Sequence, residues 1–226
     1  VVILALGLTA SLEGEEGSAD WANAGGDRPI IDLPPVQQQL LERLHALGKP
    51  IVLVLFSGSA LSVPWAHQNI PALLQAWYPG GEGGTALAEV LFGDESPSGR
   101  LPVTVVRDVE QLPPFEDYRM KGRTYRYMSA IPLYPFGFGL SYTRFSYAGP
   151  ELGTTTIRSG ESLEVKTTVR NAGEHAGDEV VQLYLSDLQA SVDVPRWSLV
   201  GFQRVRLEPG KSRELVFEIP ARRMAS

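Results

Sequence analysis

Three glutamates stand close together near the start of the chain, in the stretch LEGEE at residues 12–16. They follow an apolar run that predicts a buried strand. Carboxyl groups act as general acids, as bases and as nucleophiles. Crowding raises the pKa of one carboxyl among several neighbours, which suits a group that must hold a proton. The stretch is therefore a candidate acid/base site, and the alternative is a solvated acidic loop.

Other reactive side chains give weaker patterns. The chain has no cysteine, which excludes disulfides and a thiol site. His45, His67 and His175 do not have the spacing of metal ligands, so we predict no metal site and no cofactor. The serines of the stretch SGSALS, at residues 57–62, do not fit the turn that presents a nucleophilic serine.

A glycine-rich turn, PGGEGG at residues 79–84, formally fits part of a dinucleotide-binding pattern. It does not stand in the first strand-to-helix turn of the recognisable unit, and no convincing acidic residue follows about 20 positions later. We therefore interpret it as a glycine hinge before a helix. Nucleotide binding through this turn stays an alternative, which a titration with ATP or NAD would test.

Composition limits the class of protein. The 226 residues are 43% apolar and carry a net charge of −6. Lysines and arginines form no run, which disfavours nucleic acid and anionic membranes as partners. The opening run VVILALGLTA is too short to span a bilayer. Nothing in the composition identifies a compartment, and the chain reads as part of a longer polypeptide.

Residues 1–105 alternate apolar runs with helical periodicity, which predicts an α/β fold with an open, mostly parallel sheet flanked by helices. The expected strands are 1–6, 51–56 and 71–77, the expected helices are 35–47 and 85–92, and 101–106 is a possible edge strand. We expect the first strand to be buried on both faces. Ligands of such sheets bind beyond the carboxyl ends of the strands. The acidic stretch, SGSALS and YPGGEGG all follow strands at that edge.

The first predicted helix has an apolar face of five residues at helical spacing. They are Val36, Leu40, Leu41, Leu44 and Leu47.

Residues 146–226 have a different pattern. Apolar and polar residues alternate over 162–169, 179–185 and 214–219, with turn signals between them. Short alternating strands predict an all-β sandwich of the immunoglobulin or fibronectin III kind. We expect residues 106–145 to join the two domains.

The joining segment is rich in aromatic residues, glycine and proline, and no single period describes it. Arg123, Tyr125, Arg126 and Tyr127 alternate basic and aromatic side chains. We interpret the segment as an extended interdomain strap pinned by its rings. The alternative is a wall of a substrate cleft.

Taken together, these blocks resemble glycoside hydrolase family 3. The similarity rests on EGEE with GGDRPIIDLPPVQ, on GKPIVLVLFSGSAL, on AWYPGGEGGTALAEVLFGDESPSGRLPVT, and on GRTYRYM with LYPFGFGLSYTRF. VRNAGEHAGDEVVQLYLSD resembles the fibronectin type III-like domain at the C-terminus of family members. The form of these strings is most similar to bacterial β-xylosidases and β-glucosidases.

The resemblance implies an enzyme larger than this chain. Members combine a TIM-like barrel that carries a nucleophilic aspartate, an α/β sandwich that carries the acid/base glutamate, and the fibronectin-like domain. We therefore expect the C-terminal part of a retaining, exo-acting β-glycosidase that removes terminal β-D-glucosyl or β-D-xylosyl residues. Its expected partners are a β-linked substrate and the barrel of the same enzyme. The fragment alone is expected to be inactive, and its fibronectin-like domain to be C-terminally truncated.

Within the acidic stretch, Glu13 matches the motif of the family best, Glu16 is the next candidate for the acid/base, and Glu15 is third. We expect a structural role for Asp27 and Arg28. Trp77 and Tyr78 are expected to pack in the core, and the alternative is stacking on sugar rings. The rival function is a non-catalytic carbohydrate-binding or interaction module, because fibronectin-like folds bind more often than they catalyse.

Overall fold

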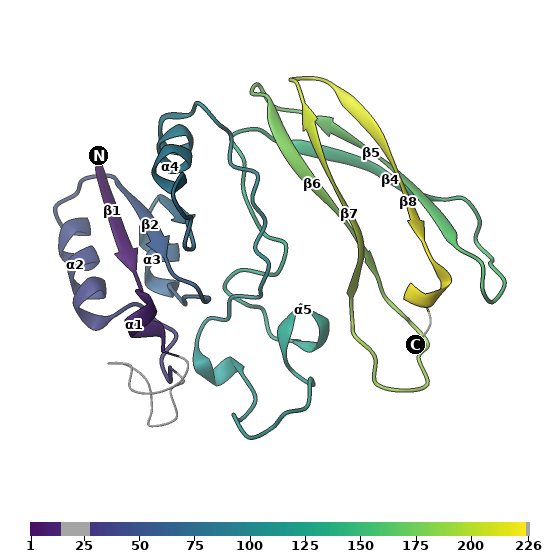
Figure 1. The fold of residues 1–226 in the computed structure, drawn as a ribbon, viewed down its shortest axis with the longest axis horizontal. Helices are drawn as coiled ribbons and strands as arrows, with labels where there is room; N and C mark the ends of the chain where they lie inside the picture. The colour runs from purple at the N-terminus through teal and green to yellow at the C-terminus, as the bar shows by residue number, and fades with distance from the viewer. Residues whose placement is uncertain (15–27, 225–226) are drawn as a thin grey trace. The chain divides into compact units, whose positions relative to one another are not determined.

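The computed structural model describes residues 1–14 and 28–224 (Figure 1). Contacts between Cα atoms divide the chain into two compact units. The first contains residues 1–88, 103–119 and 130–135, and the second contains residues 89–102, 120–129 and 136–226. The segment predicted as a strap thus contributes to both units. Across the described residues, no helix is long and apolar enough to cross a membrane.

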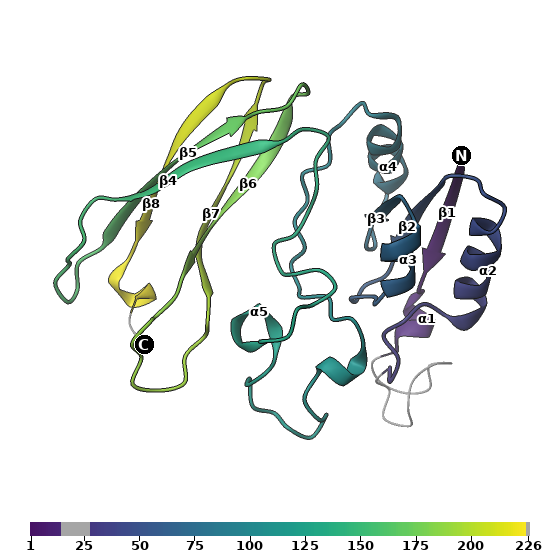
Figure 2. The same ribbon diagram turned by 180° about the vertical axis from the view of Figure 1, so that it is seen from behind.

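The first unit is built on a parallel sheet, as predicted. Its strands are β1 (Val2–Gly7), β2 (Ile51–Phe56) and β3 (Ala72–Gln75), in the order β1-β2-β3. The helices along this part of the chain are α1 (Ala10–Glu13), α2 (Pro35–His45), α3 (Pro64–Asn69) and α4 (Gly83–Phe92). Helix α2 lies next to β1 (Figures 1 and 2). The predicted α/β class of this part is confirmed.

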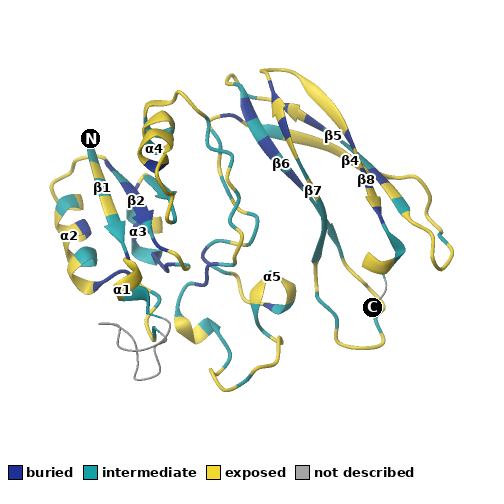
Figure 3. Ribbon diagram, viewed as in Figure 1, coloured by how far each residue is buried: buried dark blue, intermediate teal, exposed yellow. Residues whose placement is uncertain are grey.

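Burial differs between the strands of this sheet (Figure 3). The central strand β2 is almost wholly buried, with Ile51, Leu53 and Val54 at most 1% exposed. The prediction that β1 is buried on both faces is wrong for the described residues, because Ile3 is 54% exposed. Among residues 1–14 and 28–224, β1 pairs with β2 alone, so one of its edges is unpaired there.

Helix α2 begins and ends close to the predicted positions, with Pro35 in its first turn. Its apolar face is less buried than its periodicity predicts. Leu41 is fully buried, whereas Val36, Leu40 and Leu47 are exposed. The possible edge strand at 101–106 does not form either, and one isolated bridge joins Val105 to Tyr134.

The second unit contains two antiparallel sheets, which confirms the predicted fibronectin-like sandwich. One sheet has the order β4-β5-β8, and the other pairs β6 with β7. The strands are β4 (Phe145–Leu152), β5 (Leu163–Asn171), β6 (Gly177–Leu185), β7 (Ser198–Leu207) and β8 (Ser212–Ile219). Side chains from both sheets form one core, made of Val165, Val169, Val181, Val205, Leu207, Leu215, Phe217 and Ile219.

A buried ion pair joins the segment after α4 to this sandwich. Arg100 and Glu179 are 2.6 Å apart, and their side chains are only 11% and 9% exposed. The hydroxyl of Tyr147 donates to the other carboxylate oxygen of Glu179 at 2.9 Å. Because burying a charge is costly unless it is paired and hydrogen-bonded, this network fixes the segment to the sandwich.

Aromatic rings hold the described strap residues of the second unit. Tyr125, in the short helix α5 (Thr124–Tyr127), stacks on Phe136 with ring centroids 4.3 Å apart. It also meets Tyr184 of β6 edge-on at 5.9 Å. These ring contacts join α5 to Phe136 and to β6, and the interdomain strap itself stays a prediction.

Candidate functional site

The candidate site of the first unit lies at the carboxyl edge of the parallel sheet. The register aligns Gly7 with Phe56, and Leu55 with Gln75, so all three strands end at the same edge. The loops that follow therefore meet there, which is where ligands of open α/β sheets bind.

Helix α1 brings Glu13 to this edge. The chain leaves β1 through the buried Leu8, and α1 then makes a single turn in which the Glu13 N–H donates to the Thr9 carbonyl at 3.0 Å. The side chain of Gln37 in α2 binds both backbone groups of Gly7, each at 2.8 Å. The end of β1 is thus fixed just before the turn that carries Glu13.

The Glu13 carboxylate accepts hydrogen bonds from two neighbouring loops. The N–H of Gly58 lies 2.9 and 3.1 Å from its two oxygens. Ser59 donates from its N–H at 2.8 Å and from its hydroxyl at 2.7 Å, both to Oε1. The hydroxyl of Tyr78 donates to Oε2 at 2.8 Å. Three residues that follow β2 and β3 thus surround one carboxylate that follows β1.

These contacts favour the ionised form of Glu13. Burial by itself raises the pKa of the Glu13 carboxyl, but the hydrogen bonds from Ser59, Tyr78 and Gly58 lower it. Together they outweigh burial, and the pKa lies below its ordinary value of 4.5. Burial and the neighbouring Glu13 raise the pKa of the Tyr78 hydroxyl, which remains a donor. Glu13 is therefore ionised at neutral pH.

Arg28 adds a positive charge to the same site. Its Nη2 donates to the Ser59 hydroxyl at 3.1 Å and to the Ala60 carbonyl at 3.3 Å. Burial lowers the pKa of the guanidinium, and the charges of Glu13 and other neighbours oppose that effect. A guanidinium stays protonated regardless, so the site combines one carboxylate with one cation.

Two of the predicted acid/base candidates fall outside the described residues. Glu13 lies in the site, whereas Glu15 and Glu16 belong to residues 15–27, as does Asp27. Within residues 1–14 and 28–224, no group of three or more potential ligands could hold a metal ion.

Sequence reasoning missed the partners of Glu13. The sequence gives Ser59 no role, because its stretch does not fit a nucleophile turn, and it predicts that Tyr78 packs in the core or stacks on a sugar. The available signal was their position, because both follow strands of the same sheet at its carboxyl edge. Trp77, just before Tyr78, has a φ of 55°, which is uncommon for a residue with a side chain.

Close packing explains one glycine of the glycine-rich turn at 79–84. Gly83 is buried, and a Cβ atom there would collide with the ring of Pro79. This close packing gives Gly83 a structural role at the start of α4, and the interpretation as a hinge stays a prediction.

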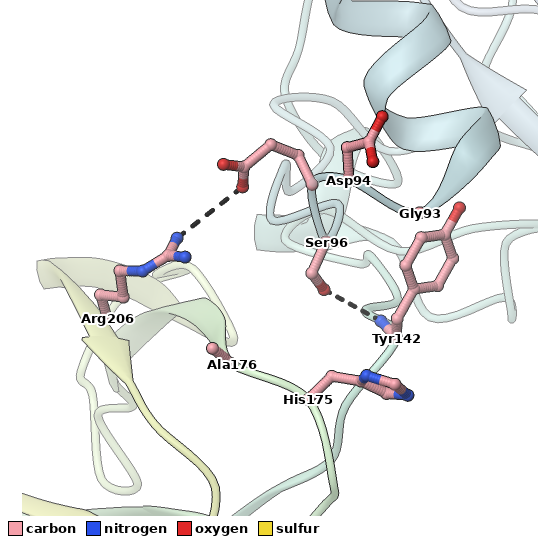
Figure 4. Close-up of a pocket in the computed structure, with 8 residues that line it drawn as sticks. Gly93, Asp94, Ser96, Tyr142, His175, Ala176 and Arg206 are labelled. Atoms are coloured by element: carbon pink, nitrogen blue, oxygen red, sulfur yellow. Dashed lines mark hydrogen bonds and ion pairs between the residues drawn. The ribbon is translucent and has the colours of Figure 1, made fainter.

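The second unit has a surface pocket lined by the segment that follows α4 and by residues of the sandwich (Figure 4). Its wall is largely polar and includes Asp94, Tyr142 and His175. Arg206 and Glu95 form an exposed ion pair across it at 3.7 Å. Exposed pairs of this kind contribute little to stability or binding, and we assign no ligand to the pocket.

Comparison with known families defines the class of the chain. Residues 1–142 match the glycosyl hydrolase family 3 C-terminal domain, and residues 179–226 match a fibronectin type III-like domain. The chain belongs to glycoside hydrolase family 3. The domain boundaries predicted at residues 105 and 145 stay predictions.

Individual relatives agree with this assignment. The chain is 46% identical to a xylan 1,4-β-xylosidase from Xylanibacter ruminicola, over 93% of this chain and 24% of the relative. It is 38% identical to a periplasmic β-glucosidase from Salmonella typhimurium, over 89% and 27%. The crystal structure of a Bifidobacterium adolescentis β-glucosidase superposes with a TM-score of 0.85 at 35% identity, over 99% of this chain and 33% of that one. The chain thus spans about a quarter of the length of these curated relatives.

Proposed function

We propose that this chain supplies the general acid/base of a retaining, exo-acting β-glycosidase. The enzyme removes terminal non-reducing β-D-glucosyl or β-D-xylosyl residues, and its nucleophilic aspartate lies in an N-terminal barrel outside this chain. The names of the relatives support the substrate class, since they include both β-xylosidases and β-glucosidases. The observation that carries the proposal is the position of Glu13 at the carboxyl edge of the sheet. Glu13 belongs to the acidic stretch at residues 12–16.

Retention requires two carboxyl groups about 5 Å apart across the glycosidic bond. The aspartate of the barrel attacks the anomeric carbon, and a covalent glycosyl–enzyme intermediate forms. The acid/base glutamate of this chain protonates the departing oxygen and afterwards deprotonates the attacking water. Each half of the enzyme therefore provides one carboxyl, and the 226 residues alone do not turn over substrate.

The acid/base is one of the three candidates in the acidic stretch, Glu13, Glu16 and Glu15. A proton donor must hold its proton near neutral pH, which requires a raised pKa. The pKa of Glu13 is lowered, which favours a carboxylate that stays ionised. We therefore assign the proton-donor role to Glu16 first, and Glu13 is the alternative.

The test uses the full-length enzyme that contains this chain, with nitrophenyl β-glucoside and β-xyloside as substrates. In the variant that lacks the acid/base, Glu16→Gln or Glu13→Gln, we expect kcat on these substrates to fall by about 100-fold or more, because water attack on the glycosyl–enzyme intermediate loses its general base. Azide should restore turnover and give a glycosyl azide of retained configuration. Glu110→Gln removes an exposed carboxylate of the same unit and is the matched control. Near-normal activity without azide rescue in both variants would refute the proposal.

A further inference from the structure

We propose that Trp197 and Arg126 form a sugar-binding site on the second unit, for a chain of pyranose rings whose hydroxyls are equatorial. Both residues belong to this unit, and both are exposed. Trp197 comes directly before β7 and is 54% exposed, although its indole ring is large and mostly apolar. The inference concerns binding rather than hydrolysis, and only the choice of β-linked glucose or xylose chains as the ligand rests on the proposed function.

A row of aromatic rings supports Trp197. Its ring meets that of Tyr184 edge-on, with centroids 6.3 Å apart. Tyr184 in turn meets Tyr125 at 5.9 Å, and Tyr125 stacks on Phe136 at 4.3 Å. The Tyr125 hydroxyl accepts the N–H of Leu199 at 3.3 Å, which ties the row to β7. The three supporting rings are partly buried, so Trp197 is the exposed end of a held row, and little freedom is lost when a ligand binds there.

Arg126 lies beside Trp197. Its backbone carbonyl accepts the N–H of Arg196 at 2.7 Å, and its Nη2 donates to the Ser198 hydroxyl at 3.4 Å. Arg126 thus contacts both chain neighbours of Trp197. A guanidinium carries five N–H donors in a planar fork. Among the contacts recorded for the described residues, Nη2 is its one side-chain donor in use, which leaves the other donors for a ligand.

This pairing of a ring with a cation suits a particular class of sugar. In β-D-glucose and β-D-xylose every ring hydroxyl is equatorial, so both faces of the pyranose present axial C–H bonds. The face of an aromatic ring is electron-rich and attracts such C–H bonds, and it buries apolar area at the same time. The hydroxyls at the rim of the sugar accept hydrogen bonds, which the guanidinium can donate. One face of the sugar therefore meets Trp197, and its rim meets Arg126.

The test is affinity electrophoresis of the full-length enzyme in native gels that contain soluble xylan or mixed-linkage β-glucan. The gels are run in the cold, where hydrolysis is slow. We expect the polysaccharide to retard the wild-type enzyme, and Trp197→Ala to raise the dissociation constant by about tenfold. Trp197→Phe keeps a ring and should retain most of the retardation. Arg126→Gln should weaken binding by a smaller factor, because it loses charge-assisted hydrogen bonds and keeps the ring.

Phe202→Ala is the matched control. Phe202 lies on β7 and is 67% exposed, and none of its recorded contacts joins it to the row of rings. It should migrate as the wild type does. Equal retardation of the wild type and Trp197→Ala would overturn the inference, as would an equal loss in Phe202→Ala. A wild-type enzyme that migrates alike with and without polysaccharide would also overturn it, and would indicate that protein covers Trp197. The azide experiment measures turnover and not retardation, so failure of the proposed function is distinguishable from failure of this site.

Discussion

At the residue scale, the site is defined by the competition between burial and hydrogen bonding at Glu13. Partial burial favours the protonated carboxyl, whereas donors from Gly58, Ser59 and Tyr78 favour the carboxylate. The donors prevail because they converge from two loops on the same two oxygens. A carboxylate held in this way is a fixed anion.

This balance predicts a pH dependence of stability. The folded-state pKa of Glu13 lies below the unfolded value, so its stabilisation is fully present above the ordinary glutamate pKa. It is lost as the pH falls through the lowered, folded-state value. We expect Glu13→Gln to reduce the urea midpoint at neutral pH, and the difference from wild type to shrink in strong acid. Glu110→Gln, at an exposed position, should show no such trend, and a constant difference for Glu13→Gln would contradict the assignment.

The sequence predicted one side of this site and not the other. The crowded carboxyls after an apolar run are a local pattern that indicates the acidic stretch, and the resemblance to the family motif selects Glu13 within it. Ser59 and Tyr78 lie 46 and 65 positions away from Glu13 along the chain. They reach Glu13 because β1, β2 and β3 are neighbours in the sheet, and the order of strands is not a local property of the sequence. The pKa direction of Glu13 follows from these distant donors, so it was equally out of reach.

At the scale of elements, a single side chain connects helix α2 to the end of β1. Gln37 accepts from the Gly7 N–H and donates to the Gly7 carbonyl, each at 2.8 Å. An amide side chain can satisfy both backbone groups at once. The helix therefore holds the point from which the turn of Glu13 starts.

Removal of this connection has a measurable cost. We expect Gln37→Ala to lower the free energy of unfolding by about 1–3 kcal/mol, because two partly buried backbone groups lose their partner. Gln38→Ala, on the same helix, loses only a side-chain contact with Glu42 and should cost about 0.3 kcal/mol. Urea unfolding of both variants measures the difference. Equal effects of the two substitutions would show that Gln37 does not hold the strand.

The elements that sequence reasoning located correctly have strong periodic patterns. The fully apolar run of β2 and the alternation of β5, β6 and β8 gave those strands directly. Strand β4 was missed because Gly149 and Pro150 interrupt its pattern, and β7 was missed as well. Periodicity identifies the apolar face of α2 but does not show what covers that face. On this face Val36, Leu40 and Leu47 are exposed.

At the scale of the whole molecule, the site is one part of a larger arrangement. The chain spans about a quarter of the length of the curated relatives that it matches. Retaining hydrolysis requires two carboxyls, and in the proposed function one of them belongs to the barrel. In the proposed function, the α/β unit with its acidic stretch is therefore necessary for turnover. It is not sufficient, because the second carboxyl comes from the barrel.

This division predicts that activity can be reconstituted from separate parts. The 226-residue chain alone should hydrolyse nitrophenyl β-glycosides no faster than buffer, since in the proposed function the nucleophile belongs to the barrel. Addition of the separately produced barrel domain should restore measurable turnover that saturates with chain concentration, because the complex must form before both carboxyls can act. The chain with Glu16→Gln should bind the barrel equally well and restore turnover only with azide. Full turnover by the wild-type chain alone would place both catalytic groups within it and refute an active site shared between two domains.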